Sequence, residues 1–178
     1  MKITIYILAI CFVGCQAKRK NIFDSFKGKS DVIIYLEKYK LDSVPAEVGI
    51  LKSAKRLYIN RDTSNGWTVY PPLSSLANVI SAPPFRNLPD EITELTNLQS
   101  LTLINLDLVT LPDKIDRLKN LDSLILFNNK LTISKEIKKI KGLKNLKYLG
   151  IQGNDVTAND LIQLKESNPN LEINPGLR

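Results

Sequence analysis

Pairs of positions separated by one residue, aliphatic in all but one case, recur along the chain. The seven pairs are Ile34/Leu36, Leu57/Ile59, Val79/Ser81, Leu101/Leu103, Leu124/Leu126, Leu149/Ile151 and Leu171/Ile173. Their first members are 23, 22, 22, 23, 25 and 22 residues apart. Alternation with period two places both members of a pair on one side of a short strand. A repeat of this length predicts a solenoid in which successive coils stack.

Three copies are long enough to show the residues that come after each strand. Leu98-x-x-Leu101-x-Leu103 is followed by Leu106, whereas the corresponding positions after the next two strands hold Asn129 and Asn154. The chain must turn there, and an asparagine amide can bond backbone groups that no neighbouring strand reaches. The stretch Leu111-Pro112-x-x-Ile115-x-x-Leu118 then has helical spacing, and proline is tolerated in the first turn of a helix.

These motifs resemble the leucine-rich repeat family, in its bacterial form with a Leu-Pro-x-x-Ile segment, over about residues 32–176. The resemblance implies an α/β solenoid: a leucine-rich-repeat horseshoe with about seven short parallel strands on its concave face and short helices or irregular turns on its convex face. A set of amphipathic helices is the alternative, but helices would keep spacings of three and four over long runs. The asparagine position holds other residues in the earlier coils, namely Tyr39, Asp62, Pro84 and Leu106. We therefore expect that end to be less regular, with an irregular loop at residues 63–67.

Both ends of a solenoid need a cover for their apolar faces. Phe23 and Phe26 are candidates at the front. At the back, Thr157 and Asp160 have the spacing of a capping box, which predicts a helix through Leu164 that ends by residues 168–169.

The first residues have the features of an export signal. A basic start is followed by the apolar run 3–13 and by Phe12-Val13-Gly14-Cys15, which resembles the lipobox of bacterial lipoproteins. The resemblance implies lipidation of Cys15. It divides the chain into a signal peptide (1–14), a lipidated terminus with linker and cap (15–31), and the repeat domain with its C-terminal cap (32–178).

Other interpretations of this leader remain open. Cleavage after Ala17 would give a secreted protein, Cys11 could be the modified residue, or the leader could stay uncleaved as an anchor. Gln16 is not the Asp that retains some lipoproteins at the inner membrane. We therefore expect a bacterial envelope location, with the outer membrane favoured over the inner membrane.

The composition limits the kinds of metal site and catalytic group that the chain can form. The chain has no histidine, and its two cysteines both lie in the leader. The mature domain therefore lacks a disulfide framework and Cys- or His-based metal sites. We predict no catalytic residues, no metal, no cofactor and no enzyme activity. The formal net charge is +7, but the basic residues are not interleaved with stacking aromatics, so no nucleic-acid partner is expected.

Residues that flank the core positions of each strand should point out of the concave sheet. Eight of them are candidate partner-binding residues: Tyr35, Tyr58, Ile80, Thr102, Ile104, Ile125, Phe127 and Tyr148. Such an apolar patch with aromatic residues is typical of interaction sites, although the same residue types simply suit strands. A second candidate surface is the segment 135–147, whose six lysines could meet anionic lipid or acidic glycan, or form an ordinary solvated face.

The sequence thus favours a non-enzymatic binding module that is anchored to a membrane by lipid and engages a protein ligand through its concave sheet. A polysaccharide is a second ligand class. The alternatives are a scaffold component without a specific ligand and a secreted protein that binds polysaccharide or host molecules.

Overall fold

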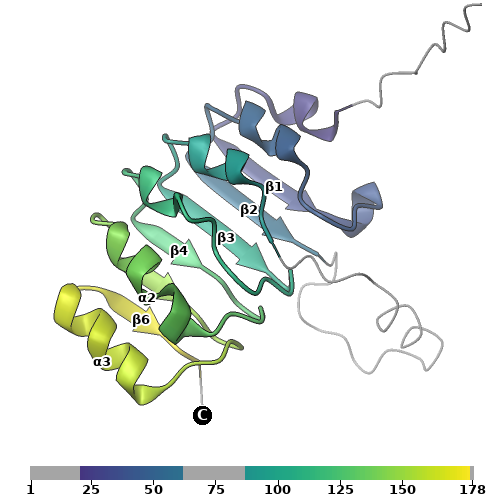
Figure 1. The fold of residues 1–178 in the computed structure, drawn as a ribbon. Helices are drawn as coiled ribbons and strands as arrows, with labels where there is room; N and C mark the ends of the chain where they lie inside the picture. The colour runs from purple at the N-terminus through teal and green to yellow at the C-terminus, as the bar shows by residue number, and fades with distance from the viewer. Residues whose placement is uncertain (1–20, 62–86, 177–178) are drawn as a thin grey trace, which may run out of the picture.

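The computed structural model describes residues 21–61 and 87–176. Within these ranges six strands form one parallel sheet in sequence order: β1 (Asp31–Tyr35), β2 (Arg56–Asn60), β3 (Ser100–Ile104), β4 (Ser123–Ile125), β5 (Tyr148–Gly150) and β6 (Glu172–Asn174). The predicted fold class is confirmed, because consecutive parallel neighbours are the arrangement of a repeat solenoid (Figure 1).

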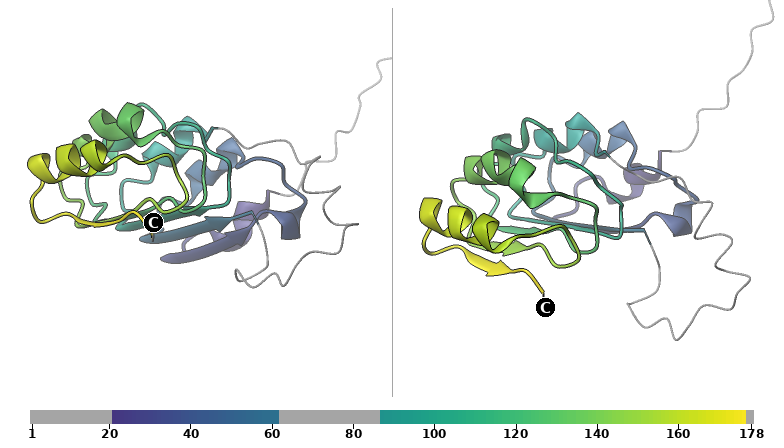
Figure 2. Two further views of the ribbon diagram at one scale, coloured as in Figure 1. Left: turned by 90° about the horizontal axis from the view of Figure 1, so that it is seen from below. Right: turned by 60° about the horizontal axis from the view of Figure 1, so that its bottom comes forward.

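One helical segment precedes β1 and the others lie in the connections between strands, most of them on one side of the sheet (Figure 2). They begin as single 3-10 turns and lengthen to α-helices toward the C-terminus. Their bounds are η1 (Ile22–Phe26), η2 (Glu37–Tyr39), η3 (Ala46–Ile50), η4 (Asp90–Glu94), η5 (Ile115–Arg117), α2 (Ile133–Gly142) and α3 (Ala158–Ser167). The prolines lie at or just before the short turns: Pro45 and Pro89 are N-caps, and the carbonyl of Pro112 accepts a hydrogen bond from the Ile115 amide.

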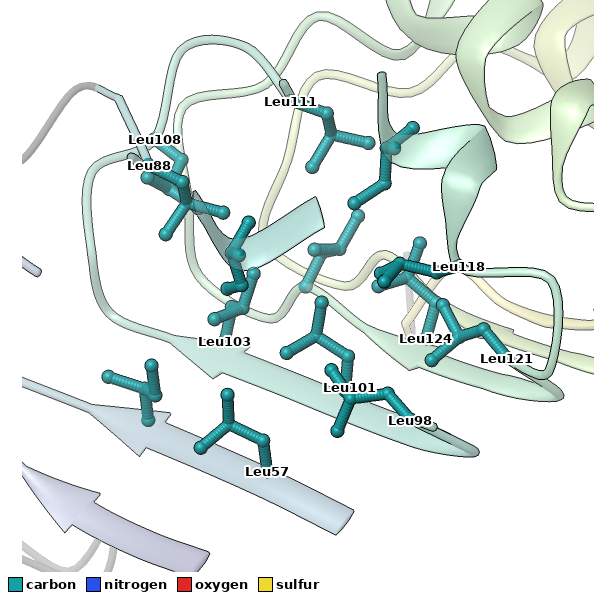
Figure 3. Packing of buried hydrophobic residues seen from close by; sticks show 14 of the residues in the cluster. Leu57, Leu88, Leu98, Leu101, Leu103, Leu108, Leu111, Leu118, Leu121 and Leu124 are labelled. Carbon is teal, nitrogen blue, oxygen red and sulfur yellow. The ribbon is translucent and has the colours of Figure 1, made fainter. Parts of the chain in front are cut away.

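The core lies between these two layers and consists almost entirely of aliphatic side chains. Each of the strands β1 to β3 contributes two of them, such as Leu101 and Leu103 on β3, which are both fully buried. Figure 3 shows them meeting leucines of the connecting segments, including Leu98, Leu118 and Leu121. Each coil thus buries its apolar side chains against the next coil.

The register at the two ends of the sheet differs from the predicted pairs. β1 pairs Val32 with Leu57 and Ile34 with Ile59, so the core pair of this strand is Val32/Ile34 and not Ile34/Leu36. Alternation alone could not decide which pair lies in the core, because Val32, Ile34 and Leu36 at alternate positions give two equally good pairs. Leu36 is still buried, but it follows the strand and leads into η2. At the other end Leu149 pairs with Ile173, not with Leu171.

The periodicity predicts a coil with Val79 and Ser81 between those of β2 and β3. β2 and β3 instead pair directly with each other, from Arg56↔Ser100 to Asn60↔Ile104. The sheet therefore has six strands in the described residues, and the interval of 44 residues between Leu57 and Leu101 belongs to one connection. Val79, Ile80 and Ser81 themselves lie outside the described residues.

Contacts on the helical side agree with this direct stacking. The Asn97 side chain donates to the Lys52 carbonyl at 2.8 Å, and the Lys52 Nζ lies 2.6 Å from the Glu94 carboxylate. The hydrogen bond and the positive charge of Lys52 lower the pKa of Glu94. The segments around η3 and η4 are therefore immediate neighbours.

Two rows of asparagines connect the coils. The Asn129 amide accepts from the Leu106 and Leu108 amides and donates to the carbonyls of Leu103, Leu126 and Phe127. Asn154 repeats this role one coil later. This confirms the predicted use of asparagine at the turn.

The second row was not predicted. Asn97, Asn120, Asn145 and Asn168 lie where the chain approaches the next strand, and each donates to a backbone carbonyl of the preceding coil at 2.7–2.9 Å.

The predicted covers are present. Phe23 in η1 is fully buried and Phe26 packs partly against the core. At the other end, Thr157 and Asp160 form the capping box of α3, with hydrogen bonds of 2.8 and 3.2 Å. Leu164 of that helix is buried in the end of the core.

Candidate functional site: the open face of the sheet

Strand side chains that point away from the leucine core form the open face of the sheet. The strand register arranges them in rows: Asp31, Arg56, Ser100, Ser123, Tyr148 and Glu172 in the first; Ile33, Tyr58, Thr102, Ile125, Gly150 and Asn174 in the second; and Tyr35, Asn60 and Ile104 in the third. Figure 2 shows the helical segments on the opposite side of the sheet. This face is therefore the one that the described helices leave uncovered.

The half of the open face on β1 to β3 is polar and aromatic. Asp31 forms an ion pair with Arg56 on the neighbouring strand. The Tyr35 and Tyr58 rings meet edge to face, with centroids 5.9 Å apart, and the Tyr58 hydroxyl accepts a hydrogen bond from the Asn60 amide at 3.1 Å. The Tyr35 prediction needs a correction of register: Tyr35 lies opposite Asn60, and Ile33 lies opposite Tyr58.

A shallow hollow lies within this half. Its volume is about 250 Å³, and its lining includes Asp31, Ile33, Arg56, Tyr58 and Ser100. A charged pair, a phenol and a hydroxyl thus border one apolar side chain. Such a combination can hydrogen-bond a ligand and also bury part of its apolar surface.

A second polar group lies where β2 and β3 end. Arg61 pairs with Asp107 at 2.5 Å between Nη2 and Oδ2, with side chains only 19% and 27% exposed. The Asn105 amide donates to Asn60 Oδ1 at 3.3 Å. Asn105 and Asp107 both have left-handed backbone, with φ of 57° and 51°. Sequence reasoning missed this group, because its members are far apart along the chain.

The half of the open face on β3 to β5 is apolar. Ile104, Ile125 and Phe127 are half-buried there. The Phe127 ring lies over Gly150 of β5: a methyl group on Gly150 would come within 2.6 Å of Phe127 Cε1 and 3.5 Å of Ile125 Cγ2. The glycine therefore provides the space in which the ring packs, and part of the ring is already used within the protein.

The predicted partner-binding residues are thus distributed over two areas. Tyr35 and Tyr58 belong to the polar half, and Ile104, Ile125 and Phe127 belong to the apolar half. Thr102 lies between them and is only 9% exposed, so it offers little contact surface. Tyr148 lies in the first row, where its hydroxyl accepts from the Asn174 amide at 3.3 Å.

Two predicted site residues, Ile80 and Cys15, lie outside the described residues. Conversely, the predicted partner-binding residues do not include Ile33, although its side chain is 58% exposed. The correct register of β1 was the missing signal, because it moves Ile33 into the middle row of the sheet.

The lysine-rich segment is less uniform than predicted. Its acid, Glu136, points into the protein, where its carboxylate accepts from the Thr110 hydroxyl at 2.8 Å and the Leu111 amide at 3.1 Å. Lys139 folds onto the same group and donates to the Leu111 carbonyl at 2.6 Å. Lys135, Lys138, Lys144 and Lys147 are exposed. The Glu136–Lys139 pair therefore fastens α2 to the preceding coil.

Two kinds of site are absent from residues 21–61 and 87–176. No helix in these ranges has the length and apolarity to cross a bilayer. No group of three or more His, Cys, Asp or Glu side chains in them is arranged to hold a metal ion.

Comparison with known proteins adds one likeness. No family model and no curated protein matches the chain. Among solved structures, the chain is similar to a leucine-rich repeat protein of Leptospira interrogans, at 28% identity and a TM-score of 0.45. The match covers 80% of this chain and 40% of that protein, so the chain spans about two fifths of the neighbour's length. The solenoid is established here by the strand order and register of the chain itself.

Proposed function

We propose that this protein is a bacterial envelope binding protein, held at a membrane by lipid on Cys15, whose open sheet face binds a protein partner. The observation that carries the binding proposal is the continuity of this face. An apolar area at Ile104, Ile125 and Phe127 lies beside a hollow bordered by Arg56 and Tyr58. Apolar centres with aromatic and arginine neighbours are the composition that protein interfaces favour.

Lipid anchoring rests on the leader sequence. Five residues, 16–20, lie between Cys15 and Asn21, the N-cap of η1. A linker of that length spans at most roughly 18 Å, which would hold the repeat domain close to the membrane surface. Diacylglyceryl and amide-linked chains together give the multiple acyl chains that stable anchoring needs.

Site-specific photo-crosslinking tests the binding face. A photoreactive amino acid replaces Ile104 in one variant and Ile162 in another, in cells that express the full chain. Ile162 is the matched control, since it is 56% exposed but lies on α3. We expect one or a few proteins to be crosslinked from position 104 and not from position 162.

The variant Ile104→Asp then decides whether the face itself binds. With the photoreactive residue moved to Tyr58, the captured protein should be lost in this variant and retained in Ile162→Asp. Equal capture by both variants, with unchanged circular dichroism, would reject the open face as the binding site.

A polysaccharide is the second candidate ligand, and the hollow on β1 to β3 is the observation that favours it. Arg56, Asp31 and Ser100 offer charged and hydroxyl groups, and Tyr58 offers an aromatic surface. If the ligand is a glycan, Tyr58→Ala should abolish retention on an immobilised envelope glycan, whereas Ile104→Asp should leave it nearly unchanged.

A further inference from the structure

A row of lysines runs along α2 and continues just past its end. Each lysine comes three residues after the previous one, and residues at this spacing are neighbours on the surface of a helix. Lys141 and Lys144 also border one hollow, between the C-terminal parts of α2 and α3. We call this row the lysine face; it consists of Lys135, Lys138, Lys141 and Lys144, of which only Lys141 is partly buried.

The acidic side chains of α2 and of the preceding coil are already paired with other lysines. Glu136, the only acid of α2, is 3% exposed and lies 3.4 Å from the Lys139 amine. Asp113 pairs with the same amine at 3.1 Å. Asp116 borders a hollow with Lys138 but forms its ion pair, at 3.6 Å, with a lysine of its own coil. Within the described residues, no ion pair holds a member of the lysine face.

This arrangement of charge is unfavourable for the isolated protein. Lysines three residues apart on a helix repel each other and weaken it. Local rules of this kind are broken mainly at functional sites, where another requirement outweighs the cost. A negatively charged surface placed against the lysine face would remove the repulsion, because its charges would lie between the lysine side chains.

The hollow beside the lysine face indicates which kind of anionic surface fits. Its volume is about 220 Å³, and its lining combines the buried side chains of Leu143, Leu146 and Leu164 with Lys141 and Lys144. Positive charge at the edge of an apolar recess suits a partner that has anionic groups beside apolar ones. A bilayer surface with anionic phospholipids has this combination, whereas a hydrated acidic glycan has only the charge.

We propose that the lysine face rests on a bilayer surface that contains anionic phospholipids, with lipid phosphates between the lysine side chains. α2 lies on the side of the sheet opposite the open face (Figure 2). A protein docked in this way presents its open face away from the lipid. Lipid and partner thus bind to separate surfaces of the protein.

The position of the proposed anchor is compatible with this contact. β1 and β5 are four strand spacings apart in the sheet, which is roughly 19 Å. The linker 16–20 has a similar reach, so the lipid on Cys15 and the lysine face can meet one bilayer. The inference rests on the proposed function only for the presence of a membrane, since the lysines can bind lipid without the anchor.

Binding to lipid vesicles tests the proposal. Every protein is the full chain with Cys11→Ala and Cys15→Ala, so the proposed anchor contributes nothing to the result. The vesicles contain phosphatidylcholine alone or with about one third phosphatidylglycerol, and we expect stronger cosedimentation with the anionic kind. Palmitate labelling of Cys15 tests the anchor separately, so each of the two proposals can fail without the other.

Two matched double variants assign the binding to the lysine face. K135Q/K138Q should weaken binding to the anionic vesicles about thirtyfold, because each lysine near a charged surface contributes about a factor of five. K38Q/K130Q removes the same charge from two exposed lysines that follow β1 and β4, and it should bind like the protein without these substitutions. Unchanged binding of K135Q/K138Q, or equal weakening in both double variants, would overturn the proposal.

The orientation on the vesicle is a second measurement, and it distinguishes the lysine face from the leader, which is the same in all variants. A fluorophore on Ser134→Cys, which is exposed beside Lys135, should be quenched by lipids that carry a quencher. A fluorophore on Ile33→Cys, on the open face, should not be quenched. Equal quenching at both positions would overturn the proposal. Retention on a sulfated polysaccharide that depends on Lys135 and Lys138, without vesicle binding, would reject lipid as the partner.

Discussion

Single asparagine side chains form several hydrogen bonds to the backbone of neighbouring coils. Asn129 is buried, and its one amide group serves backbone atoms on two successive turns. Because water cannot replace it there, removing the side chain leaves several backbone groups without partners.

The first prediction compares two asparagines. Asn129→Ala should lower the free energy of unfolding by about 2–4 kcal/mol, since unsatisfied buried groups each cost about 1–3 kcal/mol. Asn145→Ala, which removes one exposed hydrogen bond to the Lys119 carbonyl, should cost less than about 1 kcal/mol. Urea denaturation followed by circular dichroism measures both. Equal losses would show that burial of the amide is not what matters.

A second prediction concerns Gly150 and Phe127. Gly150→Ala should destabilise the protein because the new methyl group occupies the place of the aromatic ring. In the background Phe127→Ala the same substitution should be nearly harmless. The double-mutant cycle should therefore give a coupling of about 0.5–3 kcal/mol. Independent, additive effects would contradict the packing of the ring on this glycine.

The roles of single residues could be predicted from the sequence where the local pattern allows only one role for that residue type. Asn129 and Asn154 were recognised because they follow a leucine pattern at a turn. The role of Gly150 could not be predicted, because it depends on the ring of Phe127, which belongs to the preceding coil. The Arg61–Asp107 pair was missed for the same reason: the two residues are 46 positions apart.

The helical elements differ in how their ends are stabilised. α3 has a complete capping box, whereas α2 has no side-chain cap and is fastened by buried Glu136 instead. The capping residues of α3 were visible in the sequence as local spacing. The inward direction of Glu136 was not, because it depends on the Leu111 amide of the preceding coil.

The capping box gives the third prediction. Thr157→Ala should destabilise the protein by about 0.5–2 kcal/mol, because the Asp160 amide loses its partner at the start of α3. Asn159→Ala, in the same turn but exposed, is the control and should change stability by less than about 0.5 kcal/mol. Thermal unfolding of the three proteins distinguishes a cap from a general helix effect.

For the strands, alternation predicted which elements exist but not their register at the ends. In the inner strand β3, Leu101 and Leu103 alternate with the polar residues Ser100 and Thr102, so one register buries the leucines. β1 offers Val32, Ile34 and Leu36, and its register is decided by where the chain turns into η2.

At the scale of the whole molecule, the described residues form one strand fewer than the periodicity indicates. The 44 residues between Leu57 and Leu101 equal two repeats in length, which is why the periodicity predicts two coils. Spacing alone cannot distinguish two coils from one coil with a long insertion. Direct pairing of β2 with β3 leaves no place for another strand of this sheet between them.

The fourth prediction depends on that pairing. Asn60 and Leu88 are 28 residues apart, whereas Ile104 and Leu111, at the equivalent places in the next coil, are seven apart. Deleting residues 64–84 should therefore leave the β2–β3 pairing intact and change the free energy of unfolding by less than about 1 kcal/mol. Loss of the cooperative transition would show that the deleted residues are needed for stacking.

The fifth prediction concerns the leader. Cells supplied with labelled palmitate should label the protein, and Cys15→Ala should abolish the label and move the protein from the membrane to the soluble fraction. Cys11→Ala is the control and should remain labelled. Label retained in Cys15→Ala would remove the lipid anchor from the proposed function.

The second asparagine row has a consequence for the length of the molecule. Each inner coil contains its own core leucines and its own asparagine, whose amide bonds the preceding coil. These interactions are made only between neighbouring coils, so they do not depend on the total number of coils. A gene with the segment from Gln99 to Leu121 duplicated in tandem should therefore yield a longer but equally cooperative rod. The length of the solenoid can therefore be changed by adding whole repeats.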